Sequence, residues 1–420
     1  MKTETITREV AEPTSGAIVD PEKQSVMKVD IPRTRWRRAP ASLTPQRRVF
    51  VLFFMFASCS GTFFARVPDL QLALGAGEGA FGGALVGTSV GTLVALTFAG
   101  PIVERVGHRR TLLLCLPLLS MFYAAATLAP TPLMLLLTLV PAGLALGVIE
   151  IVVNLETGRI EHATGRRIMS RAHAFWSLGF FVSSLAGAAL AQLGLTRGWH
   201  LGLAAVLVSA ATWLVLRSFQ AAPERACANV QPLPAFVRPS GPILILVCIV
   251  LPAMVLEGAG FNWSGIYMRE QFAASPFLSG LAVAIGAGAQ ALVRFVADGF
   301  VGRNNPVMVA RILLAVAGLG TALVVAAGHE WIALVGFGLI GVGISAVYPI
   351  AMSAAALRTD RPAAVNVAAL AQISFVTFLV APAALGFVAE HWGIRWSFAV
   401  ALPFILVSMA AARVLASKHS

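Results

Sequence analysis

Two carboxylates lie in the middle of long apolar stretches of this sequence. Glu150 lies in GLALGVIEIVVNLETGR (143–159) and is followed one helical turn later by Asn154, whereas Glu257 lies in LPAMVLEGAGFNWSG (251–265). A charged side chain at the centre of a lipid bilayer costs about 2.5–3.5 kcal/mol on insertion scales. If these stretches cross a membrane, each carboxylate therefore needs either a compensating partner or a function.

Proton transfer is the chemistry that such groups suit. Burial favours the neutral form of a carboxyl group, so the group can bind a proton on one side of a membrane and release it on the other. Glu150 is the first candidate for proton coupling and Glu257 is the second. For each, the alternative is a structural role, with hydrogen bonds to neighbouring helices or a fixed pair with an arginine. Glu150 also lies nearer the predicted cytoplasmic end of its stretch than the centre, which leaves a gating role open.

The composition of the chain indicates that these stretches cross a membrane. The 420 residues are 58% hydrophobic and 12% charged, whereas soluble domains contain about 25% charged residues. A transmembrane helix needs about 20 apolar residues. Stretches of this kind occur at 49–67, 80–102, 111–129, 132–155, 173–195, 199–217, 241–268, 275–301, 307–327, 331–356, 365–388 and 394–415. The sequence therefore predicts an all-α membrane protein with twelve transmembrane helices.

The basic residues gather in alternate connections between these stretches. One side of the membrane receives the arginines of the N-terminal tail and of the connections near 105–110, 159–171, 217–238, 303–311 and 358–361. The other side has only Arg66, Arg197, Arg269 and Arg395. The positive-inside rule places the crowded side in the cytoplasm, together with both termini. Topology thus accounts for the net charge of +12, and no nucleic-acid partner is expected.

This pattern divides the chain into five parts. We expect a disordered basic cytoplasmic tail at 1–46, a six-helix bundle at 47–217, a cytoplasmic linker at 218–240, a second six-helix bundle at 241–415 and a short tail at 416–420. In the second apolar stretch, Gly83, Gly87 and Gly91 recur at helical spacing. Small residues on one face let helix backbones approach closely in lipid, so these glycines predict a groove for a neighbouring helix.

Further polar and aromatic side chains lie within the apolar stretches. Because exposure to lipid is costly for polar groups, we expect them to face the interior of the bundle and to line a cavity near the membrane midplane. Carboxylates, amides and aromatic rings together suit a small polar solute such as a sugar. The predicted substrate-binding residues are Asn154, Asn262, Trp263, Tyr267, Gln290, Arg294, Tyr348 and Gln372.

The string GPIVERVGHRRTL (100–112) resembles the signature of the major facilitator superfamily between its second and third helices. The matching positions are Gly100, Glu104, Arg105, Gly107, Arg109 and Arg110. Two positions depart from the pattern: Glu104 stands where aspartate is commoner, and His108 stands where arginine or lysine is. A basic, glycine-containing connection at the membrane surface can lock helix ends through charge-assisted hydrogen bonds that break at modest cost, so it suits a gate. The alternative is that these arginines only set the topology.

The second half holds a degraded copy of this string, VRFVADGFVGR (293–303). Arg294 and Asp298 lie four residues apart in it and can pair on one helix face. The recurrence supports two parallel, pseudo-symmetric six-helix halves, as the resemblance to the superfamily implies.

A narrower resemblance covers almost the whole chain beyond the tail. GTFFARVPDL, MSRAHAFWSLGFF and EGAGFNWSGIYMRE are similar to a bacterial subgroup distantly related to fucose permeases, mostly of unassigned substrate. Arg66, Pro68 and Asp69 match the end of its first helix, but Asn262 stands where that subgroup often has aspartate. We expect Arg66 and Asp69 to pair with each other or with the seventh helix, or to form an outer gate or a site for an anionic substrate. His173 either relays protons at a gate or fixes the preceding connection by a hydrogen bond.

Other classes of protein find little support in the sequence. The chain shows no metal-ligand spacing and no phosphate-binding glycine loop, so we expect neither an enzyme nor a cofactor or metal. The sequence predicts a secondary active transporter of the bacterial inner membrane, working by alternating access. Its expected partners are a small-molecule substrate, protons and the lipid bilayer, and it is expected to be a monomer. The alternative is proton-driven efflux of drugs or toxic amphipathic metabolites.

Overall fold

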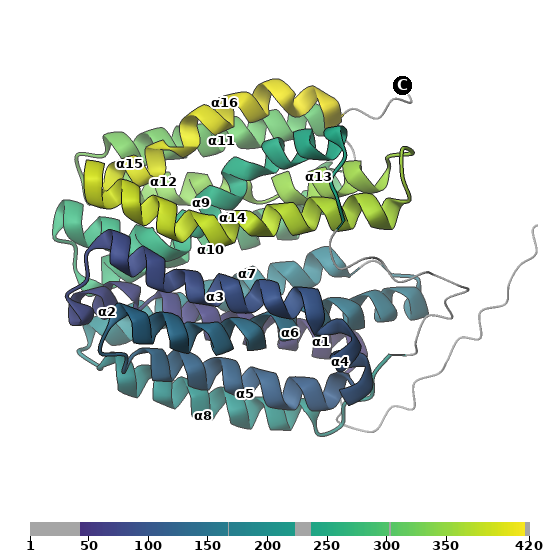
Figure 1. The fold of residues 1–420 in the computed structure, drawn as a ribbon, viewed down its shortest axis with the longest axis horizontal. Helices are drawn as coiled ribbons and strands as arrows, with labels where there is room; N and C mark the ends of the chain where they lie inside the picture. The colour runs from purple at the N-terminus through teal and green to yellow at the C-terminus, as the bar shows by residue number, and fades with distance from the viewer. Residues whose placement is uncertain (1–42, 167, 223–236, 302–303, 416–420) are drawn as a thin grey trace, which may run out of the picture. The chain divides into compact units, whose positions relative to one another are not determined.

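The computed structural model describes residues 43–166, 168–222, 237–301 and 304–415. Both predicted tails lie outside these residues, apart from 43–46, as does most of the predicted linker. Twelve helical segments in the described part are long and apolar enough to cross a membrane, which confirms the predicted number of spans. The helices α1–α8 and α9–α16 occupy two neighbouring halves of the described chain (Figure 1).

The first half contains six spans. They are α1 (Pro45–Phe64) with α2 (Val67–Leu74), α3 (Glu78–Phe98), α5 (His108–Ala126), α6 (Pro132–Thr164), α7 (Met169–Gln192) and α8 (Arg197–Leu216). The short α4 (Gly100–Val106) connects α3 to α5. With 33 residues, α6 is about 50 Å long and exceeds the apolar thickness of a bilayer. The predicted span ended at residue 155, where the apolar run stops and the helix continues.

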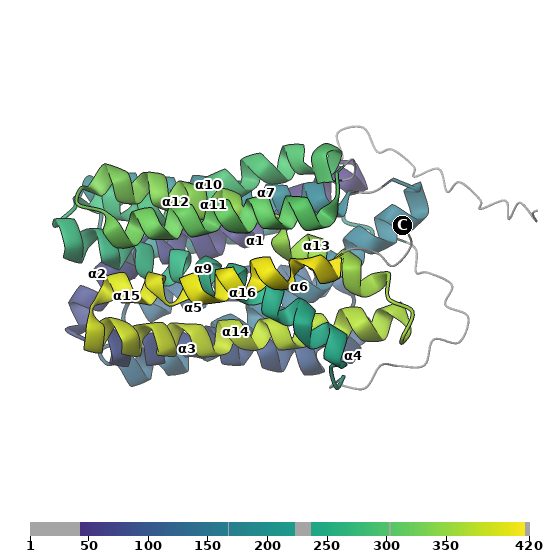
Figure 2. The same ribbon diagram turned by 90° about the horizontal axis from the view of Figure 1, so that it is seen from above.

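The second half repeats this arrangement. Its spans are α9 (Gly241–Phe272), α10 (Pro276–Val301), α11 (Pro306–Ala326), α12 (Glu330–Ile344) with α13 (Val347–Ala356), α14 (Ala363–Trp392), and α15 (Ile394–Ala399) with α16 (Ala401–Ala411). A short 3-10 helix, Ala412–Leu415, ends the described chain. Figure 2 shows the same helices after a quarter turn.

Prolines inside the spans create acceptors for contacts between helices. A proline has no N–H, so the carbonyl four residues earlier loses its helical partner. Pro252 in this way frees the carbonyl of Cys248, which accepts a hydrogen bond from Ser408 Oγ at 2.7 Å. Pro382 frees the carbonyl of Phe378, which accepts from Ser89 Oγ of the other half at 2.7 Å. The proline-containing helices α9 and α14 are thereby joined to their neighbours by side-chain hydroxyls.

Glycines allow α3 to approach two helices closely. A Cβ on Gly87 or Gly91 would collide with the backbone of α6, at Leu136 and Val140 respectively. The predicted groove for a neighbouring helix is confirmed at these two positions. Gly83 faces open space instead, and Gly82 takes the close contact with α14. The difference arises because α3 packs between two helices, so its glycines are divided between two faces.

The two ends of the bundle differ in charge. We call the end at which α4 lies the basic end, because Arg105, Arg109 and Arg110 belong to this connection. We call the other end, at which α2 lies, the opposite end. At the opposite end the two halves are joined by Arg269 of α9, whose guanidinium donates to the carbonyl of Pro68 and to Gln71 Oε1, each at 2.6 Å.

Candidate functional site

Glu150 faces a polar group that links α6 to α7. Asn154 lies one turn further along α6, and its Nδ2 donates both to the carbonyl of Glu150 and to Glu150 Oε1, each at 2.8 Å. Asn154 Oδ1 lies 3.2 Å from His173 Nε2 of α7. In the described part of the chain, no guanidinium or ammonium group lies within ion-pair distance of Glu150. Its only hydrogen-bonding partner there is an amide.

Glu257 faces an arginine in the second half. Arg294 NH2 lies 3.9 Å from Glu257 Oε1, at the outer limit of an ion pair. The guanidinium is held more firmly by two serines: NH1 donates to Ser177 Oγ of α7 at 2.6 Å, and Nε donates to the carbonyl of Ser345 at 3.2 Å. Arg294 therefore connects the second half to the first and leaves Glu257 loosely compensated.

The carbonyl that binds Arg294 is available because of a proline. Ser345 lies at the break between α12 and α13, and the residue four positions later is Pro349, which has no N–H to offer. Broken helices near the membrane midplane supply binding groups in this way. Sequence reasoning missed Ser345 and Ser177; the signal for Ser345 was the proline itself.

Tyr348 of α13 lies close to both carboxylates. Its phenol interacts electrostatically with Glu150 and with Glu257, so the two groups share one neighbourhood although they belong to different halves. Gln290 of α10 is 2% exposed and lies beside Glu257. The structure therefore brings together seven predicted site residues: Glu150, Asn154, His173, Glu257, Gln290, Arg294 and Tyr348.

Aromatic rings from both halves pack beside this group. The ring of Phe261 in α9 lies 4.4 Å from that of Phe180 and 5.9 Å from that of Phe64, measured between centroids. Trp176 lies 5.6 Å from Phe180 on the same side. Offset and tilted rings at these distances attract one another and exclude water. This aromatic layer joins α1 and α7 to α9 and forms an apolar wall near Glu257.

Three predicted substrate-binding residues lie elsewhere in α9. Asn262 Nδ2 donates to the carbonyl of Gly258 in its own helix at 2.8 Å. Trp263 is fully buried against Gly82 and Gly386. Tyr267 donates its hydroxyl to the carbonyl of Val324 at 2.6 Å and is fully buried. In this structure Trp263 and Tyr267 pack α9 against α3, α14 and α11, whereas Asn262 bonds within its own helix.

Gln372 of α14 also lies apart from the central group. Its Oε1 accepts a hydrogen bond from the backbone N–H of Val237, just before α9, at 2.9 Å. The amide therefore holds the end of the predicted linker in the structure. Sequence position placed Gln372 inside an apolar span but carried no information on this partner.

The signature residues occupy the connection between α3 and α5. Gly100 begins α4, and Gly107 ends it with a φ of 84°, a conformation that favours glycine. Arg109 Nε donates to the carbonyl of Leu216 at the end of α8, at 2.9 Å. Glu104 and Arg105 are exposed, and in the described part of the chain no ion pair joins Glu104 to another residue.

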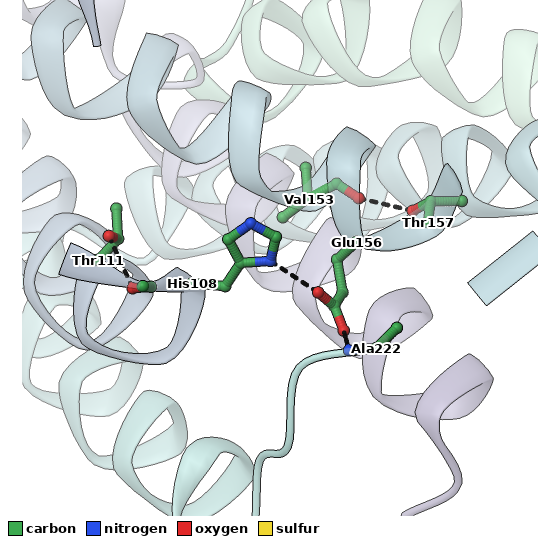
Figure 3. A network of polar contacts seen from close by, with 7 residues as sticks. His108, Thr111, Val153, Glu156, Thr157 and Ala222 are labelled. Carbon is green, nitrogen blue, oxygen red and sulfur yellow. Dashed lines mark hydrogen bonds and ion pairs between the residues drawn. The ribbon is translucent and has the colours of Figure 1, made fainter. Parts of the chain in front are cut away.

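A carboxylate that sequence reasoning missed takes the buried position near this connection. Glu156 of α6 is 1% exposed, and its Oε2 lies 2.7 Å from His108 Nδ1 (Figure 3). Its Oε1 accepts a hydrogen bond from the backbone N–H of Ala222, after α8, at 2.6 Å. Glu156 thus binds both the start of α5 and the segment that leads to the second half. Its signal in the sequence was a second carboxylate six residues after Glu150.

Arg66 and Asp69 pair at the opposite end, which confirms the predicted pair between these two residues. Arg66 Nε lies 2.9 Å from Asp69 Oδ2, and Arg66 NH2 donates to the carbonyl of Leu195 at 2.7 Å. The buried guanidinium therefore joins the α1–α2 break to the end of α7. Arg269 binds the same α2 segment, so α2 lies between two arginines.

Arg294 contacts the centre of the bundle rather than the next turn of its own helix. The predicted pair with Asp298 cannot be compared directly, because the side chain of Asp298 lies outside the described part of the chain. The contacts of Arg294 with Ser177, Ser345 and Glu257 show that its guanidinium points inward. Among the described residues, no group of three His, Cys, Asp or Glu side chains could hold a metal ion.

Comparison with known proteins agrees with this architecture. Residues 49–376 match the model of the Major Facilitator Superfamily. An uncharacterized MFS-type transporter of Yersinia pestis is 27% identical over 355 residues, which cover 83% of this chain and 90% of the relative. Solved structures with the same fold include a mutant of the nucleoside transporter NupG and a D-xylose–proton symporter.

The structural likeness is extensive although the sequences have diverged. The NupG mutant aligns with a TM-score of 0.70 at 12% identity, over 89% of this chain and 100% of that one. The D-xylose–proton symporter aligns with a TM-score of 0.68 at 10% identity, over 88% and 96%. The fold is therefore that of a twelve-helix membrane transporter. The chain belongs to the Major Facilitator Superfamily.

Proposed function

We propose that this protein is a proton-coupled secondary active transporter of a small polar solute in the bacterial inner membrane, working by alternating access. The observation that carries the proposal is Glu150, a carboxylate inside the bundle whose hydrogen-bonding partner is an amide rather than a cation. It lies near Tyr348 together with Glu257, so a proton and a solute share one neighbourhood. The names of two structural neighbours, a nucleoside transporter and a D-xylose–proton symporter, support this class of substrate.

The remaining predicted roles belong to the same proposal. Glu150 and Glu257 carry the proton, and the solute binds between the halves near Arg294, Gln290 and Tyr348. Asn262, Trp263, Tyr267 and Gln372 would reach the solute only if their helices turn during the cycle. The monomeric state, the cytoplasmic termini and the boundaries of the two bundles at 47–217 and 241–415 complete the proposal.

Gating is proposed at both ends of the bundle. At the opposite end, Arg269 holds α2 against α9 and must release it when that end opens, while the Arg66–Asp69 pair fixes α2 beside the end of α7. At the basic end, the connection from Gly100 to Arg109 joins α4, α5 and the end of α8. His173 lies between this end and the centre through its contact with Asn154.

The test separates coupling from solute binding. A ligand-stabilisation screen over sugars, organic acids and nucleosides first identifies a solute, and transport is then measured in proteoliposomes. Glu150→Gln keeps the acceptor for Asn154 but cannot exchange a proton. We expect this variant to lose proton-driven accumulation while it retains solute exchange between the two sides.

A second variant, Glu104→Gln, changes an exposed carboxylate of the same charge in the proposed gate at the basic end. Its accumulation under a proton gradient should equal that of the unchanged protein if topology alone explains the signature arginines, and should fall if the connection gates transport. Accumulation that survives Glu150→Gln in full would defeat the coupling role of Glu150.

A second candidate function is proton-driven efflux of amphipathic compounds. The aromatic layer of Phe64, Trp176, Phe180 and Phe261 favours it, because such a wall suits apolar rings better than a sugar. Vesicles of both orientations distinguish the two functions: import requires accumulation in right-side-out vesicles, and efflux requires it in inverted ones.

A further inference from the structure

A groove opens on the outer face of the first half, between α5 and α8 at the opposite end of the bundle. The two helices pack side by side at the edge of the first half that lies away from the second half (Figure 1). The groove has a volume of about 520 Å³, and small-molecule sites range over about 300–1,000 Å³. Because this edge of a twelve-span protein faces the bilayer, an occupant of the groove comes from the membrane.

Small residues leave the room for this groove. Ala124 and Ala125 of α5 and Gly198 and Gly202 of α8 line it. A Cβ on either glycine would meet no described atom outside α8 within 4 Å, whereas a Cβ on the α3 glycines that face α6 would collide with the backbone of that helix. The α8 glycines therefore do not serve close packing against a described helix, and they keep a space open at the surface.

The groove has the length of one leaflet of a bilayer. It extends along α8 from Thr196 to Ala205 and along α5 from Leu128 back to Met121. At 1.5 Å per residue, this length of α8 is about 14 Å, close to half of the roughly 30 Å apolar thickness of a bilayer. Trp199, near the start of α8, lines the groove and is 76% exposed, as is typical of an indole at the membrane interface. These dimensions suit an acyl chain of a lipid.

Among the described arginines at the opposite end, Arg197 differs from the other three. Arg66, Arg269 and Arg395 each direct two guanidinium nitrogens to partners in the chain. Arg197 uses only Nε, which donates to the carbonyl of Thr127, a residue of the groove wall, at 3.2 Å. In the described part of the chain, its NH1 and NH2 have no hydrogen-bonding partner and no carboxylate within ion-pair distance. A positive charge with two nitrogens to donate from therefore remains beside the groove.

The start of α8 adds further donors. Thr196 precedes the helix, and its side chain makes no capping hydrogen bond to the first turn. The first N–H groups of a helix have no partner within it and carry partial positive charge. Gly198 and Trp199 of this first turn line the groove, and no carboxylate does. The guanidinium of Arg197 and these N–H groups together complement an anion.

We propose that the groove binds an anionic phospholipid, with an acyl chain between α5 and α8 and the phosphate on Arg197 and the first turn of α8. A phosphate accepts charge-assisted hydrogen bonds from a guanidinium, and helix N-termini bind phosphate through their free N–H groups. The apolar wall of the groove covers the chain. The bound lipid thereby bridges the end of α5 and the start of α8.

A second copy of this chain suits the groove less well. Small residues four positions apart also favour contacts between helices in a membrane. In a symmetric dimer, however, the same patch lies on both sides of the interface. Two Arg197 guanidinium groups would then approach each other where the groove wall offers no carboxylate. A lipid phosphate neutralises this charge, whereas a second copy doubles it.

Native mass spectrometry of the delipidated full-length protein tests the proposal, because one spectrum counts bound lipids and shows the oligomeric state. The probes are dioleoyl-phosphatidylglycerol, dioleoylglycerol, which has the chains without the phosphate, and sn-glycerol 3-phosphate, which has the phosphate without the chains. We expect one phosphatidylglycerol to bind with a Kd at least about tenfold below that of dioleoylglycerol. Glycerol 3-phosphate should not bind at millimolar concentration.

A pair of arginine variants locates the phosphate. Arg197→Gln removes the charge beside the groove and should raise the Kd of phosphatidylglycerol about tenfold. The matched control is Arg311→Gln in α11. Arg311 is exposed, and its Nε also donates to a backbone carbonyl, that of Met409 at 3.1 Å. This variant should leave the Kd unchanged.

A pair of glycine variants locates the acyl chain. Gly202→Leu places a side chain in the groove and should raise the Kd of phosphatidylglycerol about tenfold. Gly83→Leu is the control, because Gly83 also faces open space but lies on α3, and it should leave the Kd unchanged. Thermal unfolding of each variant shows that it is folded.

Each of four results would overturn the proposal. Equal Kd values for phosphatidylglycerol and dioleoylglycerol would show that the phosphate is not recognised. Equal losses in Arg197→Gln and Arg311→Gln would reveal general charge attraction only. An unchanged Kd in folded Gly202→Leu would place the chain elsewhere. A lipid-free dimer that Gly202→Leu dissociates would assign the groove to a second copy.

Discussion

Glu150 and Glu156 lie on the same helix, six residues apart, and their surroundings differ almost completely. Glu156 is buried, and each of its oxygens has a partner from another segment: His108 of α5 and the backbone of Ala222. Glu150 is only half-buried and receives its hydrogen bond from Asn154 on its own helix. Six residues turn an α-helix by about 600°, which is about 240° beyond one full turn. The two carboxylates therefore point to different faces.

The comparison separates a structural acid from the acid that we propose carries protons. Hydrogen bonds that fill both oxygens of Glu156 stabilise its position and join three segments at the basic end. Glu150 has no such anchor, and its charge is compensated by no cation among the described residues. A charge inside the bundle without a counter-ion is costly, so Glu150 is suited to binding and releasing a proton. Substitution of Glu156 should therefore lower the stability of the fold, whereas substitution of Glu150 should abolish proton coupling.

The largest loss of stability is expected from Glu156→Ala. It leaves both His108 and the N–H of Ala222 without a partner in a buried place, which should lower the free energy of unfolding by about 3 kcal/mol. Unfolding of the purified protein in mixed micelles measures this value. Glu104→Ala, at an exposed position, should change it by less than about 0.5 kcal/mol. Equal stability of the two variants would contradict a structural role for Glu156.

A smaller loss is expected from His108→Leu. It leaves Glu156 Oε2 without a hydrogen-bond partner and keeps the bond to Ala222 intact. The free energy of unfolding should therefore fall by about 2 kcal/mol. Together with Glu156→Ala it forms a double-mutant cycle, in which we expect a coupling energy of about 1–2 kcal/mol. Simple additivity of the two changes would show that the pair in Figure 3 contributes little.

Asn154→Ala should have a weaker effect still. It removes the donor to Glu150 and the link to His173, both of which are partly exposed, so we expect a loss of about 1 kcal/mol. The measurement is thermal unfolding in detergent, with Ser89→Ala as a comparison because it removes one hydroxyl bond between α3 and α14. A loss of stability as large as that of Glu156→Ala would show that the hydrogen bonds around Glu150 also have a structural role.

The smallest change of stability is expected from Glu150→Gln. Glutamine keeps an oxygen for the amide of Asn154 and removes an uncompensated charge, so the free energy of unfolding should stay within about 0.5 kcal/mol or rise slightly. The same variant should lose proton-driven accumulation. A strong loss of stability here would show that Glu150 has a partner that it needs for folding.

The signature at the basic end predicted where the connection between two helices lies, but not which residues its side chains contact. Its glycines and arginines correctly marked the connection between α3 and α5, because glycine conformations and surface charge are local properties. His108, which departs from the pattern, proved to be the residue that binds Glu156. Glu104, which nearly keeps the pattern, is exposed. Only the packing of α5 against α6 distinguishes these outcomes.

The sequence by itself determined the twelve spans and the shared face of Glu150 and Asn154, because hydropathy and the helical repeat act over neighbouring residues. Pro349, whose missing N–H leaves the carbonyl of Ser345 without a helical partner, was also present in the sequence, but this signal was missed. Only the tertiary structure decided that Arg294 takes this carbonyl and that Trp263 and Tyr267 pack between helices. The reason is physical: a helix determines which residues share a face, whereas packing against other helices decides what that face meets.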